Sequence, residues 1–429
     1  MKESKAVLQI LLGEFHDKLS RLDEMVERDV RFPVAPNKVK VAIGMRRAGK
    51  TYVIYQHILK LLQEGVSKTA LLYINFEDDR LRPLNQKKLA KLVEAFYSLY
   101  PENHDRKCYL FLDEIQYVEG WPLVIRRLHD SKNAEIFLTG SSAKLLSKEI
   151  ATSLRGRSLS VEVWPYSFNE FLRAKKVSID RSLFGQKNQD KLTQLLNMYL
   201  YDGGFPETLS YSPEVRQQTL QEYLDVVIYR DIIERHKITN PSLIKYMILS
   251  MVHNVGKPFA VHKFYSDVKS QGYQIGKDIL YEYAGYIEDA YLAFAVSIYN
   301  KSLRKSTTHP KKIYAIDPGM VRALTLDYEN DLGRLFENLV FLDMKRLGYK
   351  VSYYTTSDGY EIDFLVQTAR GQKKLFQVAW NMDDPKTAQR EERALKSGMQ
   401  ELKIDGAIIT LHSYLEHGIT LLAFEDRLQ

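Results

Sequence analysis

Apolar residues recur at steps of three and four along the first thirty residues, the spacing that places them on one face of a helix. The residues in this pattern are Leu8, Leu11, Leu12, Phe15, Leu19, Leu22 and Val26. Pro33 and Pro36 follow, in a stretch that cannot continue the helix. We therefore predict an amphipathic helix over residues 1–30.

From residue 31 onward, short apolar runs alternate with helical stretches. The predicted strands are 39–43, 70–76, 108–112, 135–139 and 158–163. Between them, residues 51–64 and 86–100 have helical patterns. Strands that read as nearly continuous apolar runs between helices are typical of a parallel sheet covered on both faces. Residues 31–170 are therefore predicted to form an α/β domain.

The rest of the chain divides into three predicted segments, 171–255, 256–325 and 326–429. The first is mainly helical. The second has helices at 261–270 and 277–292 and strands at 294–300 and 312–316. Two helices followed by a hairpin are the layout of a winged helix-turn-helix. The third returns to an α/β pattern, with a helix at 332–347 and strands near Val351, at 361–366 and at 374–378.

Length and composition bound the class of protein. A chain of 429 residues is expected to form about three domains, and 45% hydrophobic with 27% charged residues is typical of a soluble globular protein. No stretch fits a membrane helix and the N-terminus lacks a signal-peptide cleavage site, so we predict a cytoplasmic protein without a membrane partner. The single cysteine, Cys108, excludes an intramolecular disulfide. A net charge of +7 permits an acidic partner without establishing one.

The segment GMRRAGKT matches the phosphate-binding pattern G-x-x-x-x-G-K-[ST], and it lies between a predicted strand and a predicted helix, as that motif requires. Its two glycines let successive backbone N–H groups face phosphate oxygens. Lys50 is expected to neutralise phosphate charge, and the Thr51 hydroxyl to bind Mg²⁺. The predicted nucleotide-binding residues are Gly44, Met45, Arg46, Arg47, Ala48, Gly49, Lys50, Thr51 and Tyr52.

The segment YLFLDE ends an apolar strand with two acids, at the sheet edge where α/β proteins bind ligands. We expect Asp113 to hold Mg²⁺ and Glu114 to orient or deprotonate the attacking water. The next predicted strand ends in Thr139, Ser141 and Ser142, and the sequence leaves open which hydroxyl contacts the nucleotide or the water.

Taken together, these motifs resemble a known family. GMRRAGKT, YLFLDEIQYVEGW, FLTGSSAKLLS, LRGRSLSVEVWPYSFNEF and YDGGFPE, in this order, are similar to the prokaryotic AAA+-type P-loop ATPases that carry a C-terminal domain of unknown function. The resemblance implies a P-loop domain of the ASCE class, with an extra strand between the loop strand and the acidic strand. It also implies that ATP binds at the glycine-rich loop and that Mg²⁺ and water are served by the two acids.

The same resemblance implies roles for two further residues. Ser141 is at the sensor position, and Arg157 is at the position of the arginine finger, which stabilises charge on the transferring phosphoryl group in cis or from a neighbouring subunit. Because SLRGRS carries two arginines, Arg155 remains an alternative to Arg157.

DNA binding would be expected in the winged-helix segment. Its hairpin carries a basic strip that could contact phosphates. These residues are Lys301, Arg304, Lys305, His309, Lys311 and Lys312. The helix that would enter the major groove instead carries acids at Asp278, Glu282, Glu288 and Asp289, which phosphates repel. A structural role for this winged helix is therefore favoured.

The C-terminal segment is similar to the core of PD-(D/E)xK nucleases, in which a helix Glu, a strand Asp and a Glu-x-Lys form a metal site. Glu337 and Asp363 match the first two positions. In FQVAW, however, Gln377 replaces the acid and Ala379 replaces the lysine. We therefore predict an inactive nuclease-like domain in which Glu337 and Asp363 are relics.

The predicted fold class is α/β: an ASCE P-loop parallel sheet, then a helical and winged-helix region, then a C-terminal α/β nuclease-like domain. The favoured function is an Mg²⁺-dependent ATPase, with ATP and Mg²⁺ as cofactors, whose nucleotide state repositions the C-terminal domains. One alternative is a slowly hydrolysing ATP-dependent signalling switch, and another is an ATP-dependent DNA-binding or DNA-processing protein. Further candidate partners are DNA or a protein at the C-terminal domains, and a second copy of the chain.

Overall fold

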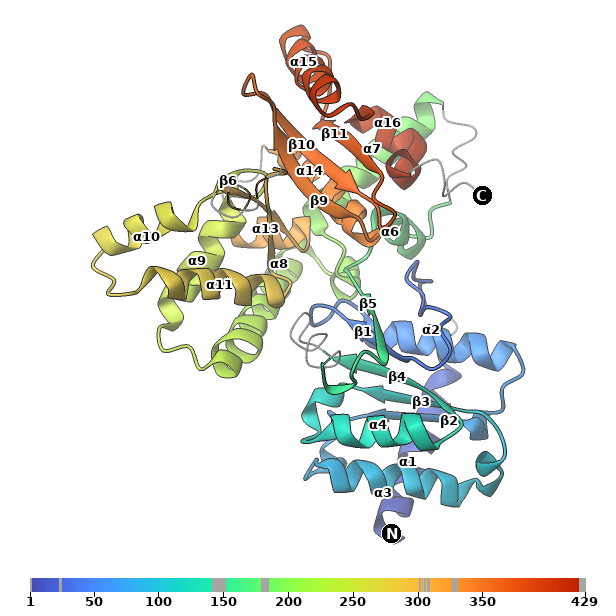
Figure 1. Cartoon of the computed structure of the whole chain (residues 1–429). Coiled ribbons are helices and arrows are strands. Elements are labelled where there is room, and N and C mark those ends of the chain that lie inside the picture. The colour runs from blue at the N-terminus through green and yellow to red at the C-terminus, as the bar shows by residue number, and fades with distance from the viewer. Residues whose placement is uncertain are drawn as a thin grey trace. The chain divides into compact units, whose positions relative to one another are not determined.

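The computed structural model describes residues 2–22, 25–140, 152–178, 185–300, 302, 304, 306, 309–325 and 331–423. The chain divides into two compact units, Met1–Trp164 and Pro165–Gln429 (Figure 1). No helix among the described residues has the length and apolar character needed to cross a membrane.

The first unit is built on a five-stranded parallel sheet with the strand order β2-β3-β4-β1-β5. Its strands are β1 (Val39–Ile43), β2 (Leu71–Asn75), β3 (Cys108–Asp113), β4 (Ala134–Gly140) and β5 (Ser158–Glu162). β4 lies between the strand before the glycine-rich loop and the strand that ends in the two acids. This is the extra strand expected of the ASCE class, so the predicted fold class is confirmed.

Helices cover both faces of this sheet (Figure 1). They are α2 (Lys50–Gln63) on one face, with α3 (Gln86–Leu99) and α4 (Trp121–Ser131) on the other. All five residues of β1 are buried. Val39, Val41 and Ile43 contribute to the core under α3 and α4, whereas Ala42 contributes to the core under α2. Burial on both sides explains why the strands read as continuous apolar runs.

The N-terminal helix is shorter than predicted. α1 (Lys2–Leu19) ends at Leu19, and the described residues between Met25 and Val34 are not helical. The buried Arg28 is held outside a helix, since its backbone N–H and carbonyl are bonded to the side chain of Gln56 on α2. The prediction of a helix over residues 1–30 was therefore wrong for residues 20–22 and 25–30.

The second unit begins with helices. They are α6 (Phe168–Ala174), α7 (Gln186–Asp202), α8 (Pro213–Val226), the π-helical turn Val227–Glu234 and α9 (Pro241–His253). After α9 come β6 (Pro258–Phe259), α10 (Val261–Ser270), α11 (Lys277–Asp289), β7 (Ala293–Val296) and β8 (Lys311–Ala315). The three strands form an antiparallel sheet in the order β6-β8-β7. The two helices and the strand pair predicted for this segment are present, whereas its assignment as a winged helix-turn-helix stays a prediction.

The chain ends in a second α/β layer. Its elements are α13 (Pro318–Leu324), α14 (Leu332–Arg346), β9 (Lys350–Thr355), β10 (Glu361–Gln367), β11 (Lys373–Ala379), α15 (Pro385–Leu402), β12 (Gly406–Thr410) and α16 (Leu411–His417). The sheet order is β12-β11-β10-β9, with antiparallel pairs except for the parallel pair of β11 and β12. The helix and hairpin predicted here are therefore present, whereas the domain boundaries within the second unit stay predictions.

Candidate active site

The glycine-rich loop joins the end of β1 to the start of α2. Gly44 has a φ of 150°, and a Cβ atom there would lie 2.2 Å from the carbonyl oxygen of Val163. Gly49 has a φ of 96° and precedes α2 with no side-chain hydrogen bond capping that helix. The first N–H groups of α2 therefore have no side-chain acceptor at the cap, and a helix N-terminus of this kind is suited to phosphate.

Lys50 lies over the loop from which it begins α2. Its side chain is buried, and Nζ donates to the carbonyl oxygens of Gly44 and Met45 at 3.2 and 3.0 Å. Both acceptors are neutral carbonyl oxygens, and the ammonium lies inside the concave side of a loop whose N–H groups favour anions. The position fits a lysine that contacts phosphate oxygens.

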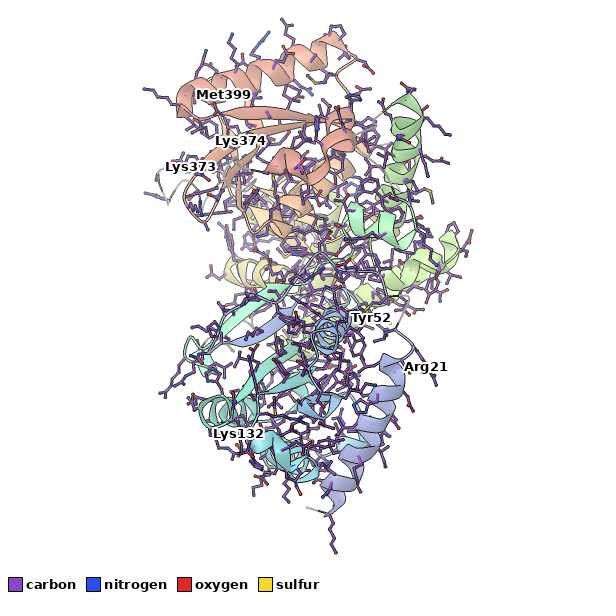
Figure 2. The ribbon with its side chains drawn as sticks, turned by 90° about the vertical axis from the view of Figure 1, so that its right-hand side faces the viewer. Arg21, Tyr52, Lys132, Lys373, Lys374 and Met399 are labelled. Carbon is purple, nitrogen blue, oxygen red and sulfur yellow. The ribbon has the colours of Figure 1, made fainter. Side chains whose placement is uncertain are left out.

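The other residues of the loop differ in what they can offer a ligand. The side chains of Met45 and Ala48 are buried in the core, so only their backbone groups can face a nucleotide. The guanidinium of Arg46 lies 4.0 Å from the carboxylate of Glu77, beyond the end of β2. Tyr52, on the first turn of α2, is 48% exposed (Figure 2).

The structure brings Asp113 against α2. The Thr51 hydroxyl donates to Asp113 Oδ2 at 2.8 Å, and the hydroxyl of Tyr73, on β2, donates to the same oxygen at 2.9 Å. Thr139, at the end of β4, donates to Asp113 Oδ1. Asp113 is fully buried, and this burial, with the charge of Glu114, raises the pKa of its carboxyl, while the three hydroxyls oppose that rise.

These groups fit a divalent cation. Mg²⁺ prefers oxygen ligands, and the Thr51 hydroxyl and the Asp113 carboxylate present oxygens from two elements within one hydrogen bond of each other. The buried carboxylate accepts hydrogen bonds from three neutral hydroxyls. A cation would offset the cost of keeping that charge out of water.

Glu114 follows at an abrupt turn. Its φ of 54° and ψ of 48° place it in the left-handed region, which residues other than glycine adopt infrequently. Its N–H donates to Thr139 Oγ1 at 2.9 Å, and Gln116 Nε2 donates to its carboxylate. Thr139 therefore positions both predicted acidic residues at once.

The predicted hydroxyl candidates have different outcomes. Thr139 contacts the acids, whereas Ser141 and Ser142 lie outside the described residues, so the sensor role of Ser141 stays a prediction. Tyr73 and Gln116 were not predicted as site residues. In the sequence, Tyr73 lies in an apolar run and Gln116 in a loop, and neither surrounding indicates a functional role. Tyr73 reaches Asp113 only because β2 pairs with β3.

Arg157 lies at the other edge of the sheet. Ser158 pairs with Val39 at the start of β1, whereas the glycine-rich loop follows the end of that strand. The Arg157 guanidinium lies 3.5 Å from the carboxylate of Asp130, and Arg155 is exposed. Arg157 therefore lies at the opposite end of the strands from the loop, and its role as an arginine finger, in cis or toward a neighbouring subunit, stays a prediction.

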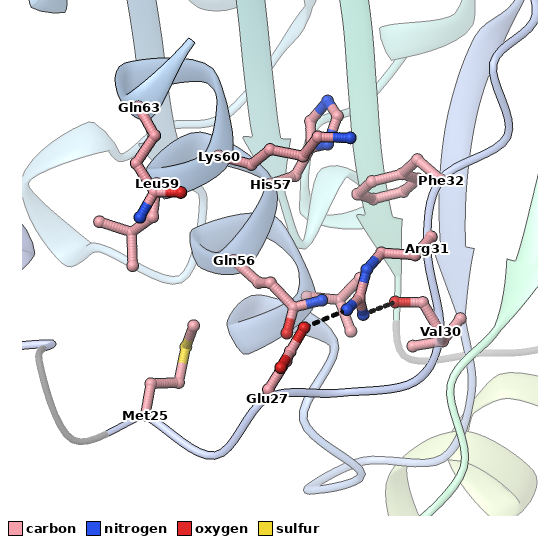
Figure 3. Close-up of a pocket in the computed structure, with 11 residues that line it drawn as sticks. Met25, Glu27, Val30, Arg31, Phe32, Gln56, His57, Leu59, Lys60 and Gln63 are labelled. Atoms are coloured by element: carbon pink, nitrogen blue, oxygen red, sulfur yellow. Dashed lines mark hydrogen bonds and ion pairs between the residues drawn. The ribbon is translucent and has the colours of Figure 1, made fainter.

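A buried arginine connects the N-terminal segment to the loop. Arg28 donates to the carbonyl oxygens of Ala48, in the loop, at 2.9 Å and of Trp164, the last residue of the first unit, at 2.6 Å. Beside it, a cavity of about 360 Å³ lies between residues 25–32 and α2. Figure 3 shows the paired side chains of Glu27 and Arg31, and that of His57 on α2, among the residues that line this cavity. Burial lowers the pKa of His57 to about 4.

One residue of the predicted basic strip is buried. Lys312, expected to contact phosphate, is 2% exposed and bonded to carboxylates of α14 and β10. Pairing of β8 with β7 directs this side chain inward, which an isolated basic stretch does not disclose. Arg304 is exposed, and Lys301 and Lys305 lie outside the described residues.

Family models match three parts of the chain. A model described as an AAA domain matches residues 36–172, and the domains of unknown function DUF8612 and DUF4143 match residues 193–331 and 332–414. An AAA domain followed by domains of unknown function is the arrangement that the resemblance of the motifs implied.

Two relatives match most of the chain. Uncharacterized protein MJ1544 of Methanocaldococcus jannaschii is 35% identical over 414 residues, covering 96% of this chain and 90% of that protein. An uncharacterized protein of Haemophilus influenzae is 31% identical over 335 residues, covering 77% and 80%. Among solved structures, the ORC1 protein of Aeropyrum pernix in complex with DNA is 12% identical over 73% of this chain and 92% of that chain, with a TM-score of 0.29. That score is too low to bear on function.

Proposed function

Because the chain belongs to a family of AAA-type P-loop ATPases with C-terminal domains of unknown function, we propose that it binds ATP with Mg²⁺ at the glycine-rich loop and hydrolyses the ATP. The observation that carries this proposal is the hydrogen bond of 2.8 Å between Thr51 and Asp113. This bond joins the glycine-rich loop to the acidic motif, 62 residues apart. A site that binds phosphate and Mg²⁺ together requires these two motifs side by side.

The chain's own groups have separate roles in binding. The N–H groups of the loop and of the first turn of α2 donate to the phosphate oxygens, and Lys50 exchanges its two carbonyl acceptors for phosphate oxygens. Thr51 and Asp113 would hold Mg²⁺, which when bound neutralises charge on the phosphates. Preorganisation of these groups avoids the cost of assembling them during the reaction.

Hydrolysis requires a group that orients water. Glu114 is the carboxylate beside the metal ligand Asp113, and Gln116 and Thr139 fix it from the side chain and from the backbone. It is therefore placed to accept a proton from the attacking water as the phosphoryl group leaves.

Contacts within the first unit support a link between the nucleotide and the second unit. Arg28 bonds Ala48 in the loop and Trp164 at the boundary, and Gly44 packs against the backbone of Val163. Movement of the loop on binding phosphate therefore reaches residues 163–164, after which the second unit begins. We infer that the nucleotide state repositions the C-terminal domains through this route.

The position of Arg157 favours a second candidate function, a slowly hydrolysing switch. Arg157 precedes β5 at the opposite end of the strands from the loop, so we expect a rapid phosphoryl transfer that needs this arginine to require a second copy. Turnover per subunit, measured across protein concentrations with size followed by light scattering, separates the two. The ATPase proposal expects turnover to rise as oligomers form, whereas the switch stays slow at every size, with and without DNA.

A further inference from the structure

A buried lysine lies at the centre of the nuclease-like domain. Lys312 Nζ, reaching from β8, lies 3.0 Å from Glu337 Oε1, 2.9 Å from Glu361 Oε1 and 2.9 Å from Asp363 Oδ1. Glu337 also accepts a hydrogen bond of 2.6 Å from the hydroxyl of Tyr314. One ammonium therefore bonds carboxylates from α14 and β10, the two elements whose acids would bind metal in a nuclease of this fold.

With the Lys312 ammonium among the acids, this cluster does not fit a divalent cation. The third acid is replaced by Gln377, whose side chain accepts from the Asp363 N–H at 3.3 Å and donates to Glu391. Ala379 offers no donor. Among the residues that the structure describes, no group of three or more His, Cys, Asp or Glu side chains is arranged to hold a metal ion.

The charge of the lysine is stabilised where it lies. Burial alone would lower the pKa of Lys312, but the neighbouring Tyr314, Asp363, Glu337 and Glu361 outweigh it and raise that pKa well above the ordinary value. The ammonium is thus a permanent cation inside the cluster. Its three donors match the number of carboxylates that it contacts.

We propose that the ammonium of Lys312 takes the place of the metal ion in this nuclease-like core, holding Glu337 and Asp363 in a metal-free ion cluster. The two acids are then not relics. They join β8 of the winged helix to α14 and β10 of the C-terminal domain, at a site where a phosphodiester cannot be cleaved by a metal-bound water. This inference is independent of ATP binding at the first unit.

Manganese binding to the full-length, nucleotide-free protein tests the proposal, with bound Mn²⁺ measured by electron paramagnetic resonance. Lys312→Met removes the ammonium and keeps an apolar stem of similar length. We expect this variant to gain one Mn²⁺ site that wild type lacks, with an affinity at least about tenfold higher than that of any site gained by the neighbouring control Lys311→Met. Adding Asp363→Asn to Lys312→Met should remove the gained site.

The wild-type protein provides a second arm that does not depend on the folding of the Lys312→Met variant. We expect wild type and Glu337→Gln to bind equal amounts of Mn²⁺, because the cluster holds none. Weaker Mn²⁺ binding by Glu337→Gln, Mn²⁺-dependent DNA cleavage lost in Asp363→Asn, or a folded Lys312→Met protein that gains no site would each overturn the proposal. Circular dichroism establishes that each variant is folded.

Discussion

The hydroxyl of Thr51 donates a hydrogen bond of 2.8 Å to Oδ2 of Asp113, a carboxylate with no exposed surface. Thr51 is the second residue of α2, after the glycine-rich loop, and Asp113 ends β3, which lies two strands from β1 in the sheet. The sheet therefore holds the two proposed metal ligands side by side. This preorganisation leads to predictions about the groups that support it.

Thr139→Val should lower ATP turnover about 10- to 100-fold while changing ATP affinity little. The substitution keeps the shape of the side chain but removes the hydroxyl that bonds both Asp113 and the Glu114 N–H. Steady-state hydrolysis and calorimetry measure the two effects separately. The matched change Thr420→Val, at an exposed threonine of the second unit, should leave both unchanged. Equal turnover in the Thr139→Val and wild-type proteins would remove the proposed role of Thr139.

Glu114→Gln should preserve ATP binding and reduce turnover by about 10²- to 10⁴-fold, because the amide cannot accept the proton of the attacking water. The variant keeps the size of the side chain and its proximity to Gln116. Glu119→Gln, at an exposed position soon after, serves as the control. A hydrolysis rate in Glu114→Gln equal to that of the control is incompatible with a general-base role.

Arg28→Ala should weaken the effect of ATP on the second unit. Hydrogen exchange measured with and without saturating ATP should differ in residues after 164 in the wild-type protein, and this difference should shrink when the bonds to Ala48 and Trp164 are removed. Arg31→Ala, at a nearby arginine that pairs with Glu27 on the surface, should retain the difference. If both variants respond to ATP as wild type does, the proposed route is wrong.

His57 should make the protein less stable as the pH falls. Its folded-state pKa of about 4 lies below the ordinary value of 6.5, so the unfolded chain takes up the proton first. The contribution is fully present above pH 6.5 and is lost as the pH falls toward 4, by about 2 kcal/mol between pH 7.5 and 5. Urea unfolding at both pH values should show a smaller loss for His57→Gln than for wild type. The exposed control His412→Gln should match wild type, and an unchanged loss in His57→Gln would contradict the account.

Much of the first unit could be predicted from its sequence because its signals are local. The strands are nearly continuous apolar runs, and the glycine-rich and acidic motifs lie at strand ends. As a result, β1 was predicted at its observed bounds, 39–43. In the second unit, the helix α10 was also predicted at its observed bounds, 261–270. Gly44 and Gly49 were identified because their conformations leave a sequence pattern.

What could not be predicted depends on buried charged residues with distant partners. Arg28 and Lys312 belong to residue types that are almost always exposed, and nothing near them in sequence indicates burial. The acceptor Trp164 is 136 residues from Arg28, and Asp363 is 51 residues from Lys312. For the same reason the end of α1 was misplaced and Lys312 was assigned to the wing.

The most direct test of the central claim is the ATP affinity of Lys50→Ala, measured by calorimetry with Mg²⁺ present. Lys60→Ala, on the same helix but with an exposed side chain, is the matched control. The account predicts that Lys60→Ala binds ATP as wild type does and that Lys50→Ala shows no measurable binding, because the loop loses its only lysine. An unchanged ATP affinity in a folded Lys50→Ala protein would contradict the claim that this loop binds the nucleotide.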